Sequence, residues 1–212
     1  MRSARDEIVG RIRAIDRMPP VPAQRGYRRV GDRDSAGRVK LFSQRVSDYR
    51  AEVGVVAADS LAAAIGAACL ARGATRVGIP AALPPAWRPD SVELVEDHGL
   101  STDELDALDA VLTGCTVAIA DTGTIVLAAG PAEGRRALSL VPDLHVCIVQ
   151  ATQIVELVTE ATAVVEDLVE RERRPITFIS GPSATSDIEL SRVEGVHGPR
   201  TLVVYIATEE DP

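Results

Sequence analysis

The sequence predicts an α/β fold, because strand-like and helix-like runs alternate along most of its 212 residues. Short β-branched runs such as 52–57 and 145–149 are separated by Ala-rich or amphipathic runs such as 60–72 and 153–170. Hydrophobic residues make up 46% of the chain and charged residues 25%, as is usual for a folded protein with a sizeable core. We therefore expect a domain built around a largely parallel sheet.

The first 50 residues (1–50) are predicted to form a helical extension of this domain. Apolar residues recur at helical spacing in 6–16 and again in 38–50, and a Pro-rich link separates the two runs. The extension carries 13 Lys and Arg against 6 Asp and Glu, whereas the remainder carries 10 against 25. Such a basic segment can dock on the chain's own acidic body, on an acidic partner or on nucleic acid. Because no aromatic residues are interleaved with the basic ones, we expect no nucleic-acid partner.

Residues 51–208 are predicted to form the body, and residues 209–212 a tail. Within the body we expect the helices 60–72, 102–108 and 153–170, and the strands 52–57, 77–79, 91–95, 145–149, 176–180 and 202–206. Two further strand-like runs, 115–120 and 124–129, are separated by Asp121-Thr-Gly123 alone. A connection this short requires an antiparallel hairpin, in which Gly123 supplies a positive φ.

The cysteines and the apolar runs restrict the class of protein. Cys69, Cys115 and Cys147 are far apart and each has apolar neighbours, which indicates buried thiols in a reducing compartment. No Cys-x-x-Cys pair occurs, so we expect this chain to hold no iron–sulfur cluster or other metal by itself. No apolar run reaches the roughly 18 residues of a membrane span. The charged N-terminus does not resemble a secretory leader, so we expect a cytoplasmic protein.

The stretch with the strongest functional signal is Ser180-Gly-Pro-Ser-Ala-Thr-Ser-Asp187, which follows an apolar strand. We expect it to open a helix near Ser186 or Asp187, where backbone N–H groups and hydroxyls bind an anion. The alternative is that these residues only form a turn and cap that helix. The stretch lacks the glycines and the lysine of a Walker A motif, and no Gly-x-Ser-x-Gly elbow is present.

Three polar turns, at 121–124, 180–189 and 195–200, are expected to converge on one pocket at the carboxyl end of the sheet. The pocket would take a small carboxylate or phosphate. Arg135 and Arg136 either bind such an anion as well or are solvated. Its predicted ligand-binding residues are Asp121, Thr122, Gly123, Thr124, Ser180, Gly181, Pro182, Ser183, Thr185, Asp187, His197, Gly198 and Arg200. Asp187, Glu189 and His197 are the candidates for an acid, base or nucleophile, and the sequence does not choose among them.

Four segments in this order, 120–127, 140–145, 178–189 and 195–200, resemble the LUD-domain family. Within it, the chain is most similar to the stand-alone C subunit of lactate-utilisation systems. The resemblance implies a three-layer α/β sandwich similar to the NagB/RpiA/CoA-transferase-like fold. It also implies a role in oxidising L-lactate to pyruvate beside two iron–sulfur partner proteins.

Two functions follow from this resemblance and from the residues. In the first, the chain is a non-redox subunit of an L-lactate utilisation system, with a small-anion or carboxylate-binding pocket and with iron–sulfur clusters only in its partners. In the second, it is a free-standing isomerase or CoA/acyl-transfer enzyme, in which Asp187, Glu189 or Glu194 acts as base or nucleophile. Association with a second copy of the chain stays open in both.

Overall fold

The computed structural model describes residues 4–14, 26–182, 184–186, 192–194 and 198–209. Its centre is a six-stranded sheet in the order β1-β12-β7-β4-β2-β3. All neighbours in this sheet are parallel, which confirms the predicted α/β class. The strands are β1 (Glu52–Ala57), β2 (Arg76–Pro80), β3 (Glu93–Asp97), β4 (Ala110–Thr113), β7 (Leu144–Gln150) and β12 (Thr201–Thr208).

A second sheet of four short strands has the order β8-β5-β6-β9. Its strands are β8 (Ile154–Val155), β5 (Val117–Ile119), β6 (Thr124–Leu127) and β9 (Thr177–Ile179). Strands β5 and β6 are antiparallel, which confirms the predicted hairpin. Among the described strands, β9 pairs only with β6, so it forms one edge of this sheet.

The remaining elements are short or helical. They are the helices α1 (Ala4–Ala14), α2 (Ser35–Asp48), α3 (Leu61–Leu70), α4 (Thr102–Asp106) and α5 (Val158–Glu170), the 3₁₀ turns η1 (Pro85–Trp87) and η2 (Ala151–Gln153), and a separate strand pair, β10 (Ala184–Ser186) with β11 (Arg192–Glu194). None of the described helices is long and apolar enough to cross a membrane.

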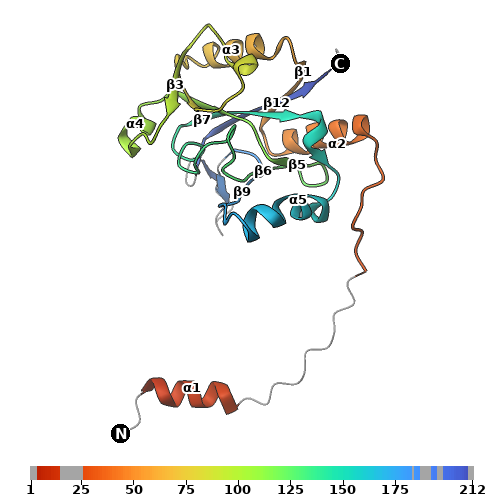
Figure 1. Cartoon of the computed structure of the whole chain (residues 1–212), viewed down its shortest axis with the longest axis vertical. Coiled ribbons are helices and arrows are strands. Elements are labelled where there is room, and N and C mark those ends of the chain that lie inside the picture. Colours follow the sequence, from red (N-terminus) through yellow and green to blue (C-terminus); the bar gives the residue numbers. More distant parts are fainter. Residues whose placement is uncertain (1–3, 15–25, 183, 187–191, 195–197, 210–212) are drawn as a thin grey trace.

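Alternating side chains of the central strands pack against different layers. Val146 and Ile148 of β7 pack with Leu61 and Ile65 of α3, whereas Cys147 and Val149 face the second sheet and α2. The outer face of the second sheet packs in turn against Ala161 and Val165 of α5. Figure 1 shows α3 on one side of the central sheet and α2, the second sheet and α5 on the other.

Helix α2 belongs to this packing although it precedes the body in sequence. Asp34 caps its first turn by accepting the N–H of Gly37 at 2.8 Å. Phe42 and Val46, four residues apart, are 0% and 1% exposed and lie in the cluster between the two sheets. The division at residue 50 stays a prediction, but α2 contributes directly to the core.

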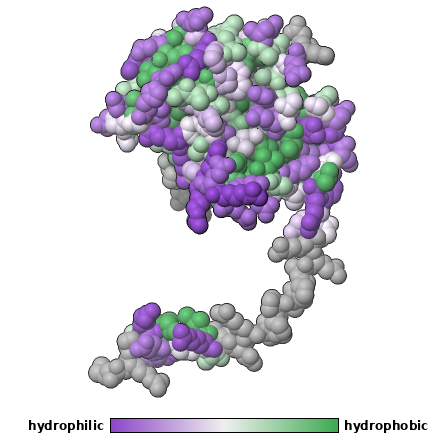
Figure 2. All heavy atoms as spheres, viewed as in Figure 1, coloured by the Kyte–Doolittle hydropathy of each residue, from purple (hydrophilic) through white to green (hydrophobic). Residues whose placement is uncertain are grey.

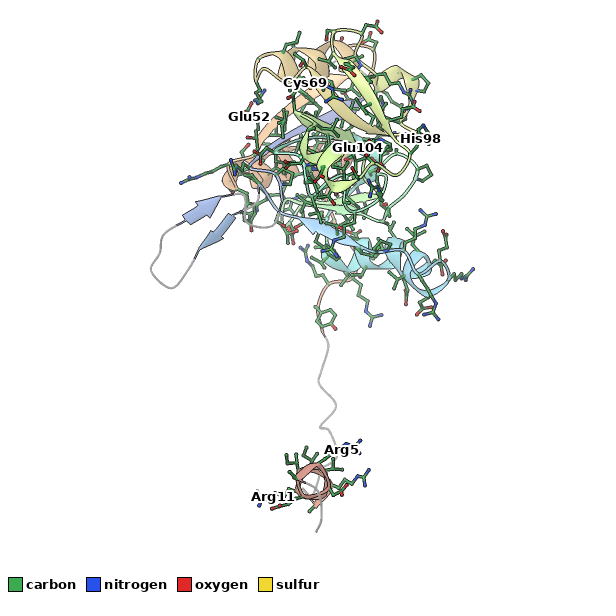
Figure 3. The ribbon with its side chains drawn as sticks, turned by 90° about the vertical axis from the view of Figure 1, so that its left-hand side faces the viewer. Arg5, Arg11, Glu52, Cys69, His98 and Glu104 are labelled. Carbon is green, nitrogen blue, oxygen red and sulfur yellow. The ribbon has the colours of Figure 1, made fainter. Side chains whose placement is uncertain are left out.

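Helix α1 differs from α2 in that it buries no residue. Ile8 and Ile12 are 58% and 50% exposed. Figures 1 and 2 draw this helix apart from the body, with apolar atoms on its surface. In Figure 3 its Arg5 and Arg11 are labelled. Arg11 pairs with Glu7 one turn earlier in the same helix.

Besides the bonds of Glu160 to Gly31 and of Thr159 to Arg28 and Arg29, residues 28–33 are attached to the body by the buried carboxylate of Glu156. It accepts the backbone N–H of Asp32 at 2.9 Å and of Arg33 at 2.8 Å, and it pairs with the guanidinium of Arg33 at 2.6 Å. Arg28 lies 3.3 Å from the same carboxylate. Arg28 and Arg33 of the basic segment therefore contact an acidic group of the chain's own body.

The structure differs from the prediction at two expected helices and at one strand that was not expected. The expected helix 153–170 begins only at Val158, because Ile154 pairs with β5 and the side chain of Gln153 donates to the carbonyl of Cys115 at 2.6 Å. Strand β4 was not predicted, because its four residues are all buried and show no alternation of apolar and polar side chains.

The third difference is the helix expected to begin near Ser186. The structure has a strand at this residue, so the predicted helix start is wrong. Residues 184–186 form β10, which pairs antiparallel with β11. Backbone groups of Ala184, Thr185 and Ser186 are therefore used in a ladder, whereas a helix start leaves its first N–H groups free for an anion. Residues 187–191 lie outside the described part.

Candidate functional site

A cavity of about 300 Å³ opens where the central sheet meets the edge strand β9. Its walls are the segment 136–140 that leads into β7, the start of β7 itself, residues 177–182 of β9 and the following turn, and residues 198–199 before β12. His145 and Leu202, each the second residue of its strand, contribute the floor. We name this hollow the amino-edge cavity, because it lies at the amino ends of β7 and β12.

Its position corrects the expectation of a pocket at the carboxyl end of the sheet. Residues 198–200 precede β12, so in a parallel sheet they lie at the amino edge. Residues 121–123 instead follow β5 of the other sheet. The polar turns sit at strand boundaries, but a turn before a strand and a turn after a strand are at opposite ends of it.

Four of the predicted ligand-binding residues line the amino-edge cavity, namely Ser180, Gly181, Pro182 and Gly198. A row of hydroxyls joins the β5–β6 hairpin to them. Thr122 Oγ1 lies 2.7 Å from Thr124 Oγ1, which lies 2.8 Å from Ser180 Oγ. Two of the three predicted turns are thus connected by direct hydrogen bonds, although Thr122 and Thr124 do not line the cavity themselves.

The structure places other predicted residues elsewhere. Asp121 lies 4.0 Å from the guanidinium of Arg28, close to Glu156. Arg200 pairs with Asp143 at 3.5 Å and lines a different hollow, together with Arg72 and Glu52. Figure 3 labels Glu52 at the start of β1. Arg200 is therefore not a donor to the amino-edge cavity in this structure.

The remaining predicted site residues cannot be placed by contacts. Ser183, Asp187, Glu189 and His197 lie outside the described residues, and Thr185 is described only as part of β10. Two candidate bases of the isomerase or acyl-transfer alternative, Asp187 and Glu189, are among them, and the third, Glu194, is described only as the last residue of β11. No contact of the described residues favours that alternative over a binding site.

The glycines of two predicted turns are explained by packing against α2. Gly123 has φ +61°, and a Cβ there would lie 2.8 Å from the carbonyl carbon of Arg45 and 2.9 Å from the nitrogen of Val46. Gly181 has φ +87°, and its Cβ would lie 2.5 Å from Cβ of Tyr49. Both turns approach the helix too closely for a side chain, so these two glycines are required by the fold itself.

Sequence reasoning missed the cavity residue His145, and it left open whether Arg135 and Arg136 bind an anion or are solvated. Arg135 and Arg136 are equivalent in sequence, and the structure separates them. Arg135 pairs with Asp97 at 2.7 Å. Arg136 lines the cavity and has no carboxylate partner among the described residues. The family-like segment 140–145 ends at His145, and this is the signal that could have drawn attention to it.

His145 is buried, with 1% of its surface exposed. Its Nε2 lies 2.7 Å from the Thr113 hydroxyl at the end of β4. Burial lowers the pKa of the imidazole to about 4, because the charged form loses its hydration. The ring is therefore neutral at physiological pH. His98 pairs with Glu96 at the surface and does not line this cavity (Figure 3), and His197 lies outside the described residues.

The electrostatic character of the cavity is set by what its lining contains. None of the described lining residues is acidic, and one of them is Arg136, which forms no ion pair with another described residue. The nearby acids are used elsewhere: Glu133, only 4% exposed, accepts the N–H groups of Ala128 and Gly130 and the hydroxyl of Thr116. An anion entering the cavity therefore meets a guanidinium and hydroxyls without a competing carboxylate from the described residues.

The cysteines give no sign of redox or nucleophilic chemistry at this site. All three are free and buried. Burial raises the pKa of the Cys147 thiol to about 12, so it stays protonated and unreactive at neutral pH. Among the described residues, no group of three or more His, Cys, Asp or Glu side chains is placed to hold a metal ion.

Comparison with known proteins gives consistent matches. The LUD domain model matches residues 94–207. A protein named lactate utilization protein C from Deinococcus radiodurans is 51% identical, over 78% of this chain and 77% of that protein. One of the same name from Geobacillus sp. strain WCH70 is 30% identical, over 62% of this chain and 57% of that protein. This chain therefore spans three quarters of the first relative's length but little more than half of the second's.

A solved structure supports the same relationship. The crystal structure of a DUF162 family protein from Deinococcus radiodurans matches with a TM-score of 0.73 and 41% identity, and the match covers 84% of this chain and all of that one. An uncharacterized protein of Neisseria meningitidis is 30% identical over 95% of this chain. Because the domain model spans more than half of the residues and these matches extend over most of the chain, the chain belongs to the LUD-domain family.

Proposed function

We propose that this chain is a subunit of an L-lactate utilisation system and that it holds a small carboxylate in the amino-edge cavity. The names of its relatives support the first part. The observation that carries the second part is the Arg136 guanidinium, which lines the cavity without a carboxylate partner among the described residues. Guanidinium groups bind carboxylates through two parallel hydrogen bonds, so an arginine with no ion-pair partner among the described residues, beside a hollow whose described lining has no acid, suits such a ligand.

In this proposal the chain contributes binding and no redox centre of its own. Its three cysteines are scattered and buried, whereas iron–sulfur clusters need several thiolates close together. Electron transfer would then belong to iron–sulfur partner proteins. Free thiols of this kind also suit the reducing cytoplasm, where we place the subunit.

Carboxylate binding is tested by calorimetric titration of the full chain with L-lactate. Replacing Arg136 with alanine is expected to raise the Kd roughly 10- to 100-fold, the usual effect of losing a hydrogen bond to a charged group. Arg171→Ala is the matched control, because that arginine is 78% exposed on its side chain and pairs with Asp167 one turn earlier on α5. Equal affinity in wild type and Arg136→Ala, or no binding to wild type, would contradict the proposed site.

Membership of the system is tested separately by affinity purification of the tagged full chain from cells grown on lactate. We expect co-purified proteins that contain iron, with the visible absorbance of iron–sulfur clusters, whereas the chain purified alone should be colourless. Elution of the chain without iron under these growth conditions would argue against a stable complex of this kind.

A further inference from the structure

A groove of about 590 Å³ runs along the exposed side of α5, and the proposed function does not use it. One wall is a stripe of α5 at three- and four-residue spacing: Thr159, Thr162, Ala163, Glu166, Val169 and Glu170. The other wall is formed by Tyr27 and Arg29, and the hydroxyl of Thr159 donates to the carbonyl of Arg29 at 3.3 Å. Tyr27 and Val169 are 57% and 45% exposed, so the described part of the chain leaves apolar surface uncovered in this groove.

The α5 wall of the groove is acidic. Helix α5 contains four carboxylates and no Lys or Arg. Glu166 and Glu170 are exposed, and neither forms an ion pair with another described residue. Arg29 gives the opposite wall a positive charge. A well-matched occupant would therefore have an apolar face with basic residues on one side and an acidic residue on the other.

Helix α1 has a face of this kind. Ile8 and Ile12 are one turn apart and are 58% and 50% exposed. In α-helical geometry Arg5 and Arg13 lie on one side of this apolar pair, whereas Glu7 lies on the other. The order of charges around α1 is therefore complementary to the two walls of the α5 groove.

The length of α1 fits as well. At about 1.5 Å per residue its 11 residues extend about 16 Å, close to the length of the stripe 159–170. A helix this short is only marginally stable by itself in water, so packing against another surface would stabilise it. In the single chain α1 buries no residue, and Figure 1 shows it away from α5. Each copy thus offers an unpacked helix and, among its described residues, an uncovered groove.

We infer that two copies of the chain associate by exchanging α1, so that the helix of each copy lies in the α5 groove of the other. The link 15–25 can extend up to about 40 Å, which lets α1 reach a neighbouring body. In each contact the two isoleucines pack on Ala163 and Val169. The arginine side of α1 faces the α5 carboxylates, and Glu7 faces Arg29. The exchange gives a symmetric pair with two identical contacts.

Sedimentation of the full chain over a range of concentrations tests this association. The mass of the wild-type chain should rise from 22.5 kDa toward twice that value. Ile12→Asp places a carboxylate in the apolar face and beside an acidic wall, so it should raise the Kd of the pair at least roughly 10-fold. Gly10→Asp is the matched control, because it adds the same charge on the opposite side of α1, where a Cβ has open space around it.

Two outcomes of this experiment would overturn the inference. One is a wild-type chain that stays monomeric up to roughly 1 mM, as it would if α1 bound its own body or an unrelated partner protein. The other is an Ile12→Asp chain that associates as tightly as wild type, which would place the contact between copies on another surface.

A mixing experiment distinguishes exchange from other ways of using the same helix. Ala163→Arg blocks the groove at an exposed position of α5 and keeps a good helix former there. Alone, it should associate as weakly as Ile12→Asp. A mixture of the two variants has one intact helix and one intact groove on different copies, so mixed pairs should form more readily than pairs of either variant.

Fluorescence energy transfer between differently labelled copies measures the mixed pairs, and thermal melting checks that each variant is folded. No gain on mixing the two folded variants would overturn the exchange. Binding of L-lactate should be unchanged in both variants, because no residue of α1 or α5 lines the amino-edge cavity in the described part. The failure of this inference is therefore distinguishable from a failure of the proposed carboxylate site.

Discussion

Replacing Phe42 with alanine is expected to lower the free energy of unfolding by about 3–5 kcal/mol, the usual cost of emptying a buried aromatic site. Phe42 is 0% exposed and lies in the cluster that joins α2, the second sheet and the central sheet. The chain has only two phenylalanines, so few other bulky rings are present to fill the space. For a chain of this size the melting temperature should fall by roughly 10 °C.

Lys40→Ala is the matched control, because Lys40 is exposed on the same helix. It tests whether the loss comes from the removed ring or from a change in helix propensity, since alanine favours helix at both positions. Differential scanning calorimetry of both variants provides the measurement. A Phe42→Ala variant that melts within about 2 °C of wild type would mean that α2 is not part of the cooperative core.

Glu156→Gln is expected to cause the second large loss, a fall of roughly 10 °C in melting temperature at neutral pH. The side chain of Glu156 is 1% exposed and accepts two backbone N–H groups and the Arg33 guanidinium. An amide of the same size would turn N–H groups toward these donors or leave them partly unpaired. The segment 28–33 should then be held less tightly, by its remaining bonds to Thr159 and Glu160 of α5.

The pH dependence has a definite sign. The backbone N–H of Arg33, followed by that of Asp32 and by the charges of Arg33 and Arg28, lowers the pKa of Glu156 below its ordinary value of 4.5. Its contribution to stability is therefore complete above the unfolded pKa and is lost as pH falls through the folded pKa. The melting-temperature difference between wild type and Glu156→Gln should shrink from pH 6 to pH 3. Glu166→Gln, on the exposed face of α5, is the control. A difference that stays constant over this range would show that the carboxylate charge is not what holds the segment.

Several features of this protein can be predicted from local patterns. The β5–β6 hairpin follows from two apolar runs with three turn residues between them, because no other connection of that length is sterically available. The parallel sheet follows from alternating strand-like and helical runs, and the burial of Phe42 and Val46 is consistent with their helical spacing. The polar-turn pattern also predicts Ser180, Gly181, Pro182 and Gly198 as ligand-binding residues, and these four do line one cavity. Whether they bind a ligand there stays a prediction.

Other features depend on contacts between residues far apart in the chain. The sequence could not distinguish Arg135 from Arg136, because only the position of Asp97, 38 residues earlier, decides which guanidinium is neutralised. It also could not show that residues 184–186 pair with 192–194 instead of opening a helix, since both states use the same polar residues.

By itself, then, the sequence determined the class of fold, the hairpin and the polar turns, because these depend on periodicity and on turn chemistry within a few residues. Only the tertiary structure decided that the cavity lies at the amino edge of β7 and β12, and that His145 and Arg136 line it. The reason is physical. The edge at which a turn lies depends on strand order and direction, and whether a charged side chain is neutralised depends on neighbours that chain folding brings together.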